Sequence, residues 1–217
     1  MNNKFKNTDS LIFDLDGTLW DAVSGVTTAW NIAIKKFNLN MILTENDVRG
    51  IMGLTAQGIK EKLFPNLHKN AQDELFTQCS KEEQIYLNAN GAKIYPKVKE
   101  TLAQLSLSMP LFIVSNCGHG YIEAFLDYYN LRPYIKDFEY FTRTGLEKGE
   151  NIKLIIDRNN LKHPIYIGDT MGDYKGAKYA DIPFIFAAYG FGTMETAETT
   201  ITNFADLKTL FNTQGAN

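Results

Sequence analysis

The sequence predicts an α/β fold in which helices cover both faces of a parallel sheet and a helical segment is inserted after the first strand. Short apolar runs alternate with amphipathic stretches over the second half of the chain. Such alternation is typical of right-handed βαβ units, whose strands pair in parallel. A long helical stretch separates the first apolar run from the others, and 217 residues suffice for one sizeable core plus an insertion.

The first strand is predicted from residues 10–16, SLIFDLD, an apolar run that ends in Asp14 and Asp16. Residues two apart on a strand point to the same side, but the chain has to turn at Gly17, so Asp16 can take a separate position. Two carboxylates at one bend repel each other. We therefore expect a cation, or a reaction that uses both acids, at the end of this strand.

Residues 22–92 are predicted to form a helical domain, because apolar residues recur there at helical spacing and strand signals are almost absent. The sheet domain then comprises residues 1–21 and 93–217. The two junctions between the domains are candidate hinges.

Strands and helices are predicted to alternate after this insertion. Strands are predicted at residues 111–115, 137–141, 164–168 and 183–187. Helices are predicted at residues 98–107, 121–129, 152–159 and 173–179. In a sheet of this kind ligands gather beyond the carboxyl ends of the strands, so polar residues at those ends are candidate site residues.

The composition favours a small-molecule partner. The formal net charge of −3 gives no basic surface for nucleic acid or for an anionic membrane, and no apolar run approaches the length that spans a bilayer. Residues 1–9 have no apolar signal-peptide core, so a cytoplasmic location is expected. Cys79 and Cys117 lack the spacing of a disulfide framework or a zinc site. The oligomeric state is not indicated.

Several polar residues are predicted to meet in one crevice, although they are distant in sequence. Each follows a predicted strand or opens a predicted helix. They are Asp14, Asp16, Ser115, Asn116, Lys148, Asp169 and Asp173.

These residue types suit transfer of a phosphoryl group. A carboxylate can act as a nucleophile towards phosphorus while a second acid protonates the leaving oxygen, so Asp14 is the candidate nucleophile and Asp16 the candidate acid and base. Mg²⁺ prefers oxygen ligands, and Asp14, Asp169 and the backbone carbonyl of Asp16 form a candidate shell for it. Asp173 would bind the ion directly or through water.

The phosphoryl oxygens carry negative charge and need hydrogen-bond donors and cations around them. Ser115 offers a hydroxyl, Asn116 a backbone N–H, and Lys148 a positive charge. Taken singly, the aspartates could be helix caps or turn residues, and Ser115 and Asn116 ordinary strand-end residues. Their occurrence together favours a catalytic site.

Four segments match, in order, the four motifs of the haloacid dehalogenase superfamily of hydrolases, which the chain resembles from Leu11 to about Gly192. They are DLDGTLWD, IVSN, Lys148 within LEKGENI, and IGDTMGD. The helical insertion after the first motif resembles the subfamily of phosphoglycolate phosphatase and β-phosphoglucomutase.

The resemblance implies a Rossmann-like core with a mobile helical cap domain, Mg²⁺ as cofactor, and an aspartyl-phosphate intermediate on Asp14. Members that cleave carbon–halogen or carbon–phosphorus bonds lack the second acid of the first motif. Because Asp16 is present, the resemblance favours phosphate-ester chemistry.

Three further residues allow two interpretations each. Arg49, in VRGIMG, resembles a segment that reaches over the site in related phosphatases, where it could bind a second anionic group of the substrate; a solvated helix face explains it nearly as well. Trp20 could narrow the entrance or anchor the cap. Tyr121 belongs to an aromatic run that fits core and helix surface better than a cofactor site.

The expected function is a magnesium-dependent phosphatase acting on a small phosphorylated metabolite. One alternative is a phosphomutase similar to β-phosphoglucomutase, which would share all of these core residues. The other is a non-catalytic phosphate-binding regulatory module, which would be expected to have lost one of the acids.

Overall fold

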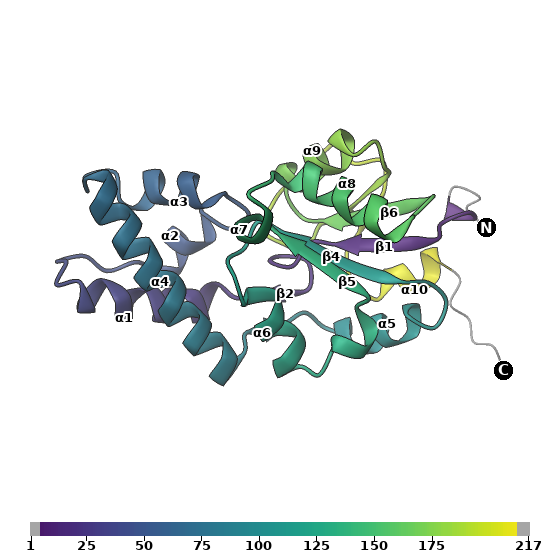
Figure 1. Cartoon of the computed structure of the whole chain (residues 1–217). Helices are drawn as coiled ribbons and strands as arrows, with labels where there is room; N and C mark the ends of the chain where they lie inside the picture. Colours follow the sequence, from purple (N-terminus) through teal and green to yellow (C-terminus); the bar gives the residue numbers. More distant parts are fainter. Residues whose placement is uncertain (1–4, 212–217) are drawn as a thin grey trace.

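The computed structural model describes residues 5–211 and contains a six-stranded parallel sheet with the strand order β5-β4-β1-β6-β7-β8 (Figure 1). This confirms the predicted α/β class. The strands are β1 (Ser10–Phe13), β4 (Leu111–Ser115), β5 (Asp137–Tyr140), β6 (Pro164–Gly168), β7 (Phe184–Ala187) and β8 (Thr200–Ile201). Because β1 lies between β4 and β6, the strand order reverses beside it, and a crevice is expected beyond its carboxyl end.

Both faces of the sheet are buried under helices. Leu11 and Phe13 belong to one apolar cluster and Ile12 to another, as the alternation of side chains along a strand requires. Figure 1 shows α8 and α9 over one face and α5, α6 and α10 over the other. These helices are α5 (Val98–Leu105), α6 (Tyr121–Tyr128), α8 (Lys148–Asn159), α9 (Met171–Tyr179) and α10 (Asp206–Leu210).

Four helices lie beside the sheet rather than on its faces (Figure 1). They are α1 (Val23–Lys36), α2 (Glu45–Arg49), α3 (Ala56–Leu63) and α4 (Lys69–Asn90). Two short strands that the sequence did not predict, β2 (Trp20–Asp21) and β3 (Lys93–Ile94), pair antiparallel where the chain enters and leaves these helices. Strands β2 and β3 have two residues each, which is too few for an alternation of apolar and polar residues to be recognised in the sequence. That the helices move as a cap domain stays a prediction.

Helices α8 and α9 begin earlier in the chain than their apolar periodicity predicts. Glu147 and Glu150 form a capping box at α8, and Thr170 and Asp173 form another at α9. Polar side chains that accept hydrogen bonds from backbone N–H groups define these ends, and apolar periodicity does not detect them. As a result, Lys148 and Asp173 both lie in the first turn of a helix, at the edge of the sheet that carries the crevice.

Other boundaries differ by a residue or two. Helix α5 ends at Leu105, β5 ends at Tyr140, and the next residue opens a helical turn, α7 (Phe141–Thr144). The 3₁₀ turn η2 (Arg132–Tyr134) and strand β8 were not predicted, because they are too short for a periodic pattern. Within the described residues, Cys79 and Cys117 are free thiols. No helix in residues 5–211 is long and apolar enough to cross a membrane.

Candidate active site

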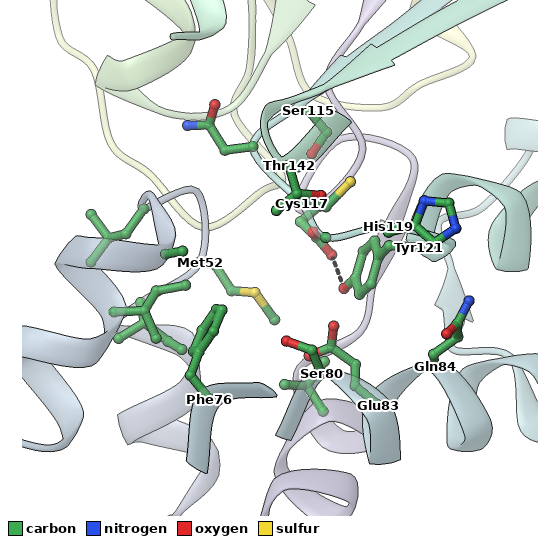
Figure 2. Close-up of a pocket in the computed structure, with 18 of the residues that line it drawn as sticks. Met52, Phe76, Ser80, Glu83, Gln84, Ser115, Cys117, His119, Tyr121 and Thr142 are labelled. Atoms are coloured by element: carbon green, nitrogen blue, oxygen red, sulfur yellow. Dashed lines mark hydrogen bonds between the residues drawn. The ribbon is translucent and has the colours of Figure 1, made fainter. Parts of the chain in front are cut away.

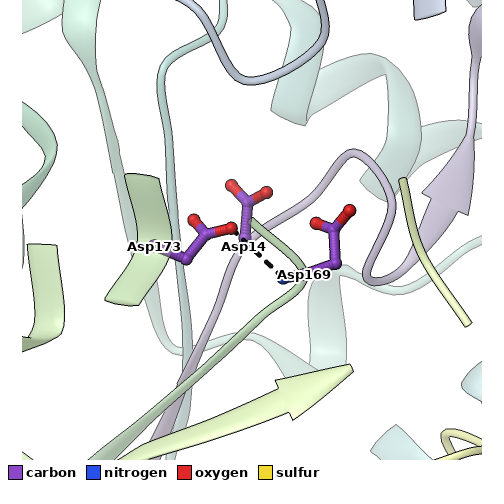
Figure 3. A group of neighbouring side chains, drawn as sticks. All are labelled: Asp14, Asp169 and Asp173. Atoms are coloured by element: carbon purple, nitrogen blue, oxygen red, sulfur yellow. Dashed lines mark hydrogen bonds between the residues drawn. The ribbon is translucent and has the colours of Figure 1, made fainter. Parts of the chain in front are cut away.

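Three buried aspartates meet at the carboxyl ends of β1 and β6. Asp14 follows β1, Asp169 follows β6, and Asp173 lies in the first turn of α9. One carboxylate oxygen from each lies within 4.8 Å of the others (Figure 3). Because β1 and β6 are neighbouring parallel strands, their ends share one edge of the sheet, and this brings together acids 155 residues apart (169 − 14). The predicted convergence of these positions is therefore present.

Lys148 is the cation of this cluster. Its Nζ donates hydrogen bonds to Asp14 Oδ1 at 2.8 Å and to Asp173 Oδ1 at 2.5 Å. Burial by itself would lower the pKa of Lys148, but the two carboxylates outweigh it and raise that pKa above its usual range. Lys148 is therefore a protonated, fixed positive charge beside Asp14.

Asp169 is held by groups from two loops. The backbone N–H of Phe191 donates to its Oδ2 at 2.7 Å, and the hydroxyl of Thr18 donates to its Oδ1 at 3.3 Å. Gly17 turns the chain with φ +81°, and a Cβ there would lie 2.1 Å from Asp169 Oδ2. Only glycine therefore permits both the turn and the approach of Asp169.

The negative charge of the three clustered carboxylates exceeds the positive charge of Lys148. Burial, and then the charge of Asp173, raise the pKa of Asp14 to about 6 despite its bond to Lys148. The same two causes raise the pKa of Asp169 to about 8. Three hard oxygen donors with uncompensated charge, close enough to share an ion, fit Mg²⁺.

Asp16 stands apart from the three clustered acids. Its Oδ1 accepts a hydrogen bond from the hydroxyl of Tyr121 at 2.8 Å, drawn as the dashed line at Tyr121 in Figure 2. It accepts a second from the indole N–H of Trp20 at 2.9 Å. Burial, and then the charge of Asp14, raise the pKa of Asp16 to about 7. The side chain can therefore hold or release a proton near neutrality, which suits an acid and base.

Two aromatic residues have contacts that the sequence analysis did not assign. Trp20 is fully buried and packs edge-on against Tyr121 and Phe125, so it is a core residue as well as a partner of Asp16. Tyr121 is buried, as expected, but its hydroxyl reaches Asp16. The position of Tyr121, five residues after Asn116 at the end of the second motif, was the available signal for this contact.

A cavity of about 380 Å³ opens beside these acids, between the sheet edge and helices α1, α3 and α4. Asp14, Asp16, Ser115 and Asn116 line its sheet side. The amide Nδ2 of Asn116 donates to the backbone oxygen of Gly53 at 3.0 Å, while its Oδ1 is buried without a partner among the described residues. Asn116 thus connects the sheet edge to the segment between α2 and α3.

Arg49 and Glu83 differ in their relation to this cavity. The guanidinium of Arg49 lies 3.7 Å from the carboxylate of Asp21 and 5.2 Å from the ring centre of Phe191, and Arg49 is not among the described residues that line the cavity. Its contact with a substrate stays a prediction. Glu83 does line the cavity, but no sequence pattern indicated this, because Glu83 lies in the charged run KEEQ.

Residues 11–187 match the model of the haloacid dehalogenase-like hydrolase family. The chain belongs to this family. This confirms the resemblance predicted from the four ordered motifs, and the protein is accordingly a hydrolase.

Haloacid dehalogenase-like hydrolases of several bacteria are similar to the chain over nearly its whole length. Phosphoglycolate phosphatase of Yersinia pseudotuberculosis is 25% identical to it, over 94% of this chain and 93% of the relative. A haloacid dehalogenase-like hydrolase of Streptococcus pneumoniae has the same fold, with a TM-score of 0.82, 20% identity, and 95% and 99% of the two chains covered. A structure described as a predicted phosphoglycolate phosphatase of Haemophilus somnus aligns with a TM-score of 0.82 at 21% identity, over 94% and 97%.

Proposed function

We propose that this haloacid dehalogenase-like hydrolase is a cytoplasmic, magnesium-dependent phosphatase that cleaves a small phosphorylated metabolite through an aspartyl-phosphate on Asp14. One observation carries the proposal: Asp14 is paired with Lys148 at the bottom of a cavity, and Asp16, two residues on, is held separately by Tyr121. The similarity to phosphoglycolate phosphatases supports a phosphate ester as the substrate. The free thiols are usual for a reducing compartment.

In the first step, a carboxylate oxygen of Asp14 attacks phosphorus and the bond from phosphorus to the ester oxygen breaks. Asp16 gives its proton to the leaving oxygen. The raised pKa of Asp16 means that this proton is present near neutral pH. In the second step, Asp16 takes a proton from water, the water oxygen attacks phosphorus, and Asp14 is released with inorganic phosphate.

The phosphoryl group would be held by Ser115, by the backbone N–H of Asn116 and by Lys148, which is already fixed beside Asp14. Asp14, Asp169 and the backbone carbonyl of Asp16 would hold Mg²⁺, with Asp173 bound directly or through water. The ion would neutralise charge on the phosphoryl oxygens. Each of these metal ligands belongs to the buried acid cluster or to the loop that follows β1.

Replacement of the nucleophile tests this mechanism. Asp14→Asn keeps the size of the side chain but removes the attacking carboxylate, so release of inorganic phosphate from an aryl phosphate with Mg²⁺ should fall by about 10³-fold or more. Asp157→Asn, a matched change on the exposed side of α8, should keep the rate of the unaltered protein. Equal melting temperatures would exclude loss of fold, and full turnover by Asp14→Asn would refute the mechanism.

Assays of the same protein preparation with sugar phosphates distinguish a phosphatase from the alternative, a phosphomutase. A mutase returns the phosphoryl group to a sugar hydroxyl, so it would interconvert sugar phosphates with little release of inorganic phosphate. A phosphatase releases inorganic phosphate from them.

A further inference from the structure

The wall that α4 contributes to the cavity combines apolar side chains with one half-buried carboxylate. Glu83, on α4, is fixed by the indole N–H of Trp30, which donates to its Oε2 at 2.6 Å. Figure 2 shows Glu83 and its neighbour Ser80 directed from α4 into the cavity, on the side facing Tyr121. Apolar side chains surround them, among them Met52, Leu54, Ile59 and Phe76.

Positive charge is scarce on this wall. Among the described residues that line the cavity, Lys81 is the only lysine or arginine, and it is exposed. Arg49 lies outside the lining and pairs with Asp21, and Lys148 is bound to Asp14 and Asp173. Burial raises the pKa of Glu83 to about 8, and the charge of Asp16 acts in the same direction. Above about pH 8, a second anionic group in the cavity would therefore face the ionised carboxylate of Glu83 without a buried cation to bind it.

Hydrogen-bonding groups on α4 complete the wall. Ser80 and Gln84 line the cavity together with Glu83, because residues three and four apart lie on one face of a helix. The indole of Trp30 fixes one oxygen of the Glu83 carboxyl, so the group is already oriented before a ligand arrives. The carboxyl group can accept a hydrogen bond from a hydroxyl or an amino group, while the apolar side chains contact a carbon skeleton.

We propose that the substrate is the phosphate monoester of an uncharged or cationic alcohol, which donates a hydroxyl or amino group to Glu83, and that phosphorylated carboxylic acids are disfavoured. This proposal rests on the phosphatase function above. It departs from the substrate in the name of the phosphoglycolate phosphatases to which the chain is similar. Glu83 is the residue to which we assign this selectivity.

The test uses esters that share a carbon skeleton and differ only in the terminal group. 2-Phosphoglycolate ends in a carboxylate, 2-hydroxyethyl phosphate in a hydroxyl and 2-aminoethyl phosphate in an ammonium group; a second set carries the same ends on a longer chain. At about pH 9, where Glu83 is ionised, we expect kcat/KM for the hydroxyl and ammonium esters of at least one set to exceed that for the carboxylate ester by about tenfold or more.

Glu83→Gln keeps an oxygen that can accept from Trp30 but removes the charge. At about pH 9, where Glu83 is ionised, the variant should lower the preference for the ammonium ester over the carboxylate ester by about tenfold. Glu74→Gln, the matched change at an exposed position of the same helix, should leave that ratio unchanged. Because the readout is a ratio within one preparation, partial loss of folded protein does not affect it.

An aryl phosphate assayed in parallel distinguishes failure of the phosphatase function from failure of the proposed substrate selectivity. If the unaltered protein with Mg²⁺ hydrolyses neither the aryl phosphate nor any ester of the sets, the proposed phosphatase function fails. If it hydrolyses them and prefers the carboxylate ester, the selectivity proposal is overturned, and loss of that preference in Lys81→Gln or Arg49→Gln would identify the cation responsible. An unchanged ratio in Glu83→Gln would also overturn it.

Discussion

Carboxyl groups in this site differ because of their immediate partners. Burial and a neighbouring carboxylate raise the pKa of Asp14 to about 6 and that of Asp16 to about 7. Their partners oppose this rise: a buried ammonium group bonds to Asp14, and a phenol and an indole donate to Asp16. Among residues 5–211, Glu83 accepts a hydrogen bond from one indole N–H and pairs with no cation, and its pKa rises further, to about 8. The chemistry of each acid thus depends on one or two neighbouring side chains.

The raised pKa of Glu83 predicts a pH dependence of stability. Between its usual pKa near 4.5 and about 8, the unfolded chain releases a proton that the folded chain keeps, so the free energy of unfolding falls as pH rises. Glu83→Gln does not titrate there. Its stability should equal that of the unaltered protein at about pH 5 and exceed it at pH 8, on the order of 1 kcal/mol because the side chain lines a cavity that admits water.

Urea unfolding of both proteins across this range measures the difference. The quantity of interest is the free energy of unfolding of Glu83→Gln minus that of the unaltered protein. If this difference stays constant with pH, or becomes smaller as pH rises, Glu83 ionises normally in the folded protein. Glu74→Gln serves as the control, and its difference in free energy of unfolding from the unaltered protein should stay the same across this pH range.

At the scale of elements, the ends of strands and helices carry the site. Parallel strands β1 and β6 end at the same edge of the sheet, and α8 and α9 begin there with capping boxes. The hydroxyl of Thr170 makes two hydrogen bonds to Asp173. It accepts one from the backbone N–H of Asp173 and donates one to the Asp173 carboxylate at 2.6 Å. The start of α9 therefore also orients an acid of the candidate metal site.

Thr170→Ala should affect both stability and activity. Loss of the cap should lower the free energy of unfolding by about 1 kcal/mol, and the freed Asp173 should lower kcat/KM by roughly tenfold. Thr44→Ala removes an exposed capping box at α2 and should lower stability by a similar amount with kcat/KM unchanged. Urea unfolding and phosphate release measure both; a Thr170→Ala enzyme with full activity would show that the cap does not position Asp173.

At the scale of the whole molecule, the acid cluster opposes folding until a cation neutralises it. Strands β1 and β6 and helix α9 bring Asp14, Asp169 and Asp173 together in the interior, and Lys148 compensates only part of their charge. Under the proposed function the folded chain would bind a divalent ion at this cluster, whereas the unfolded chain would have no such site. Ion binding should therefore stabilise the entire molecule.

Magnesium at millimolar concentration should raise the melting temperature by several degrees relative to a chelator. Asp169→Asn should melt higher than the unaltered protein in the chelator, because a buried charge is gone, and should lose most of the magnesium-dependent increase. Asp157→Asn should keep that increase. Scanning calorimetry measures all three, and an increase of the same size in Asp169→Asn would place the ion elsewhere.

The sequence by itself determined the α/β class and the convergence of Asp14, Lys148 and Asp169, because apolar periodicity places strands and parallel strands end at a common edge. It could not determine which side chains on the inserted helices face that edge. Tyr121 meets Asp16 across 105 positions of chain, Glu83 meets Trp30 across 53, and Arg49 lies beside Asp21 rather than in the cavity lining. Only the packing of the helices against the sheet decides such contacts, because no local pattern records where two distant side chains will meet.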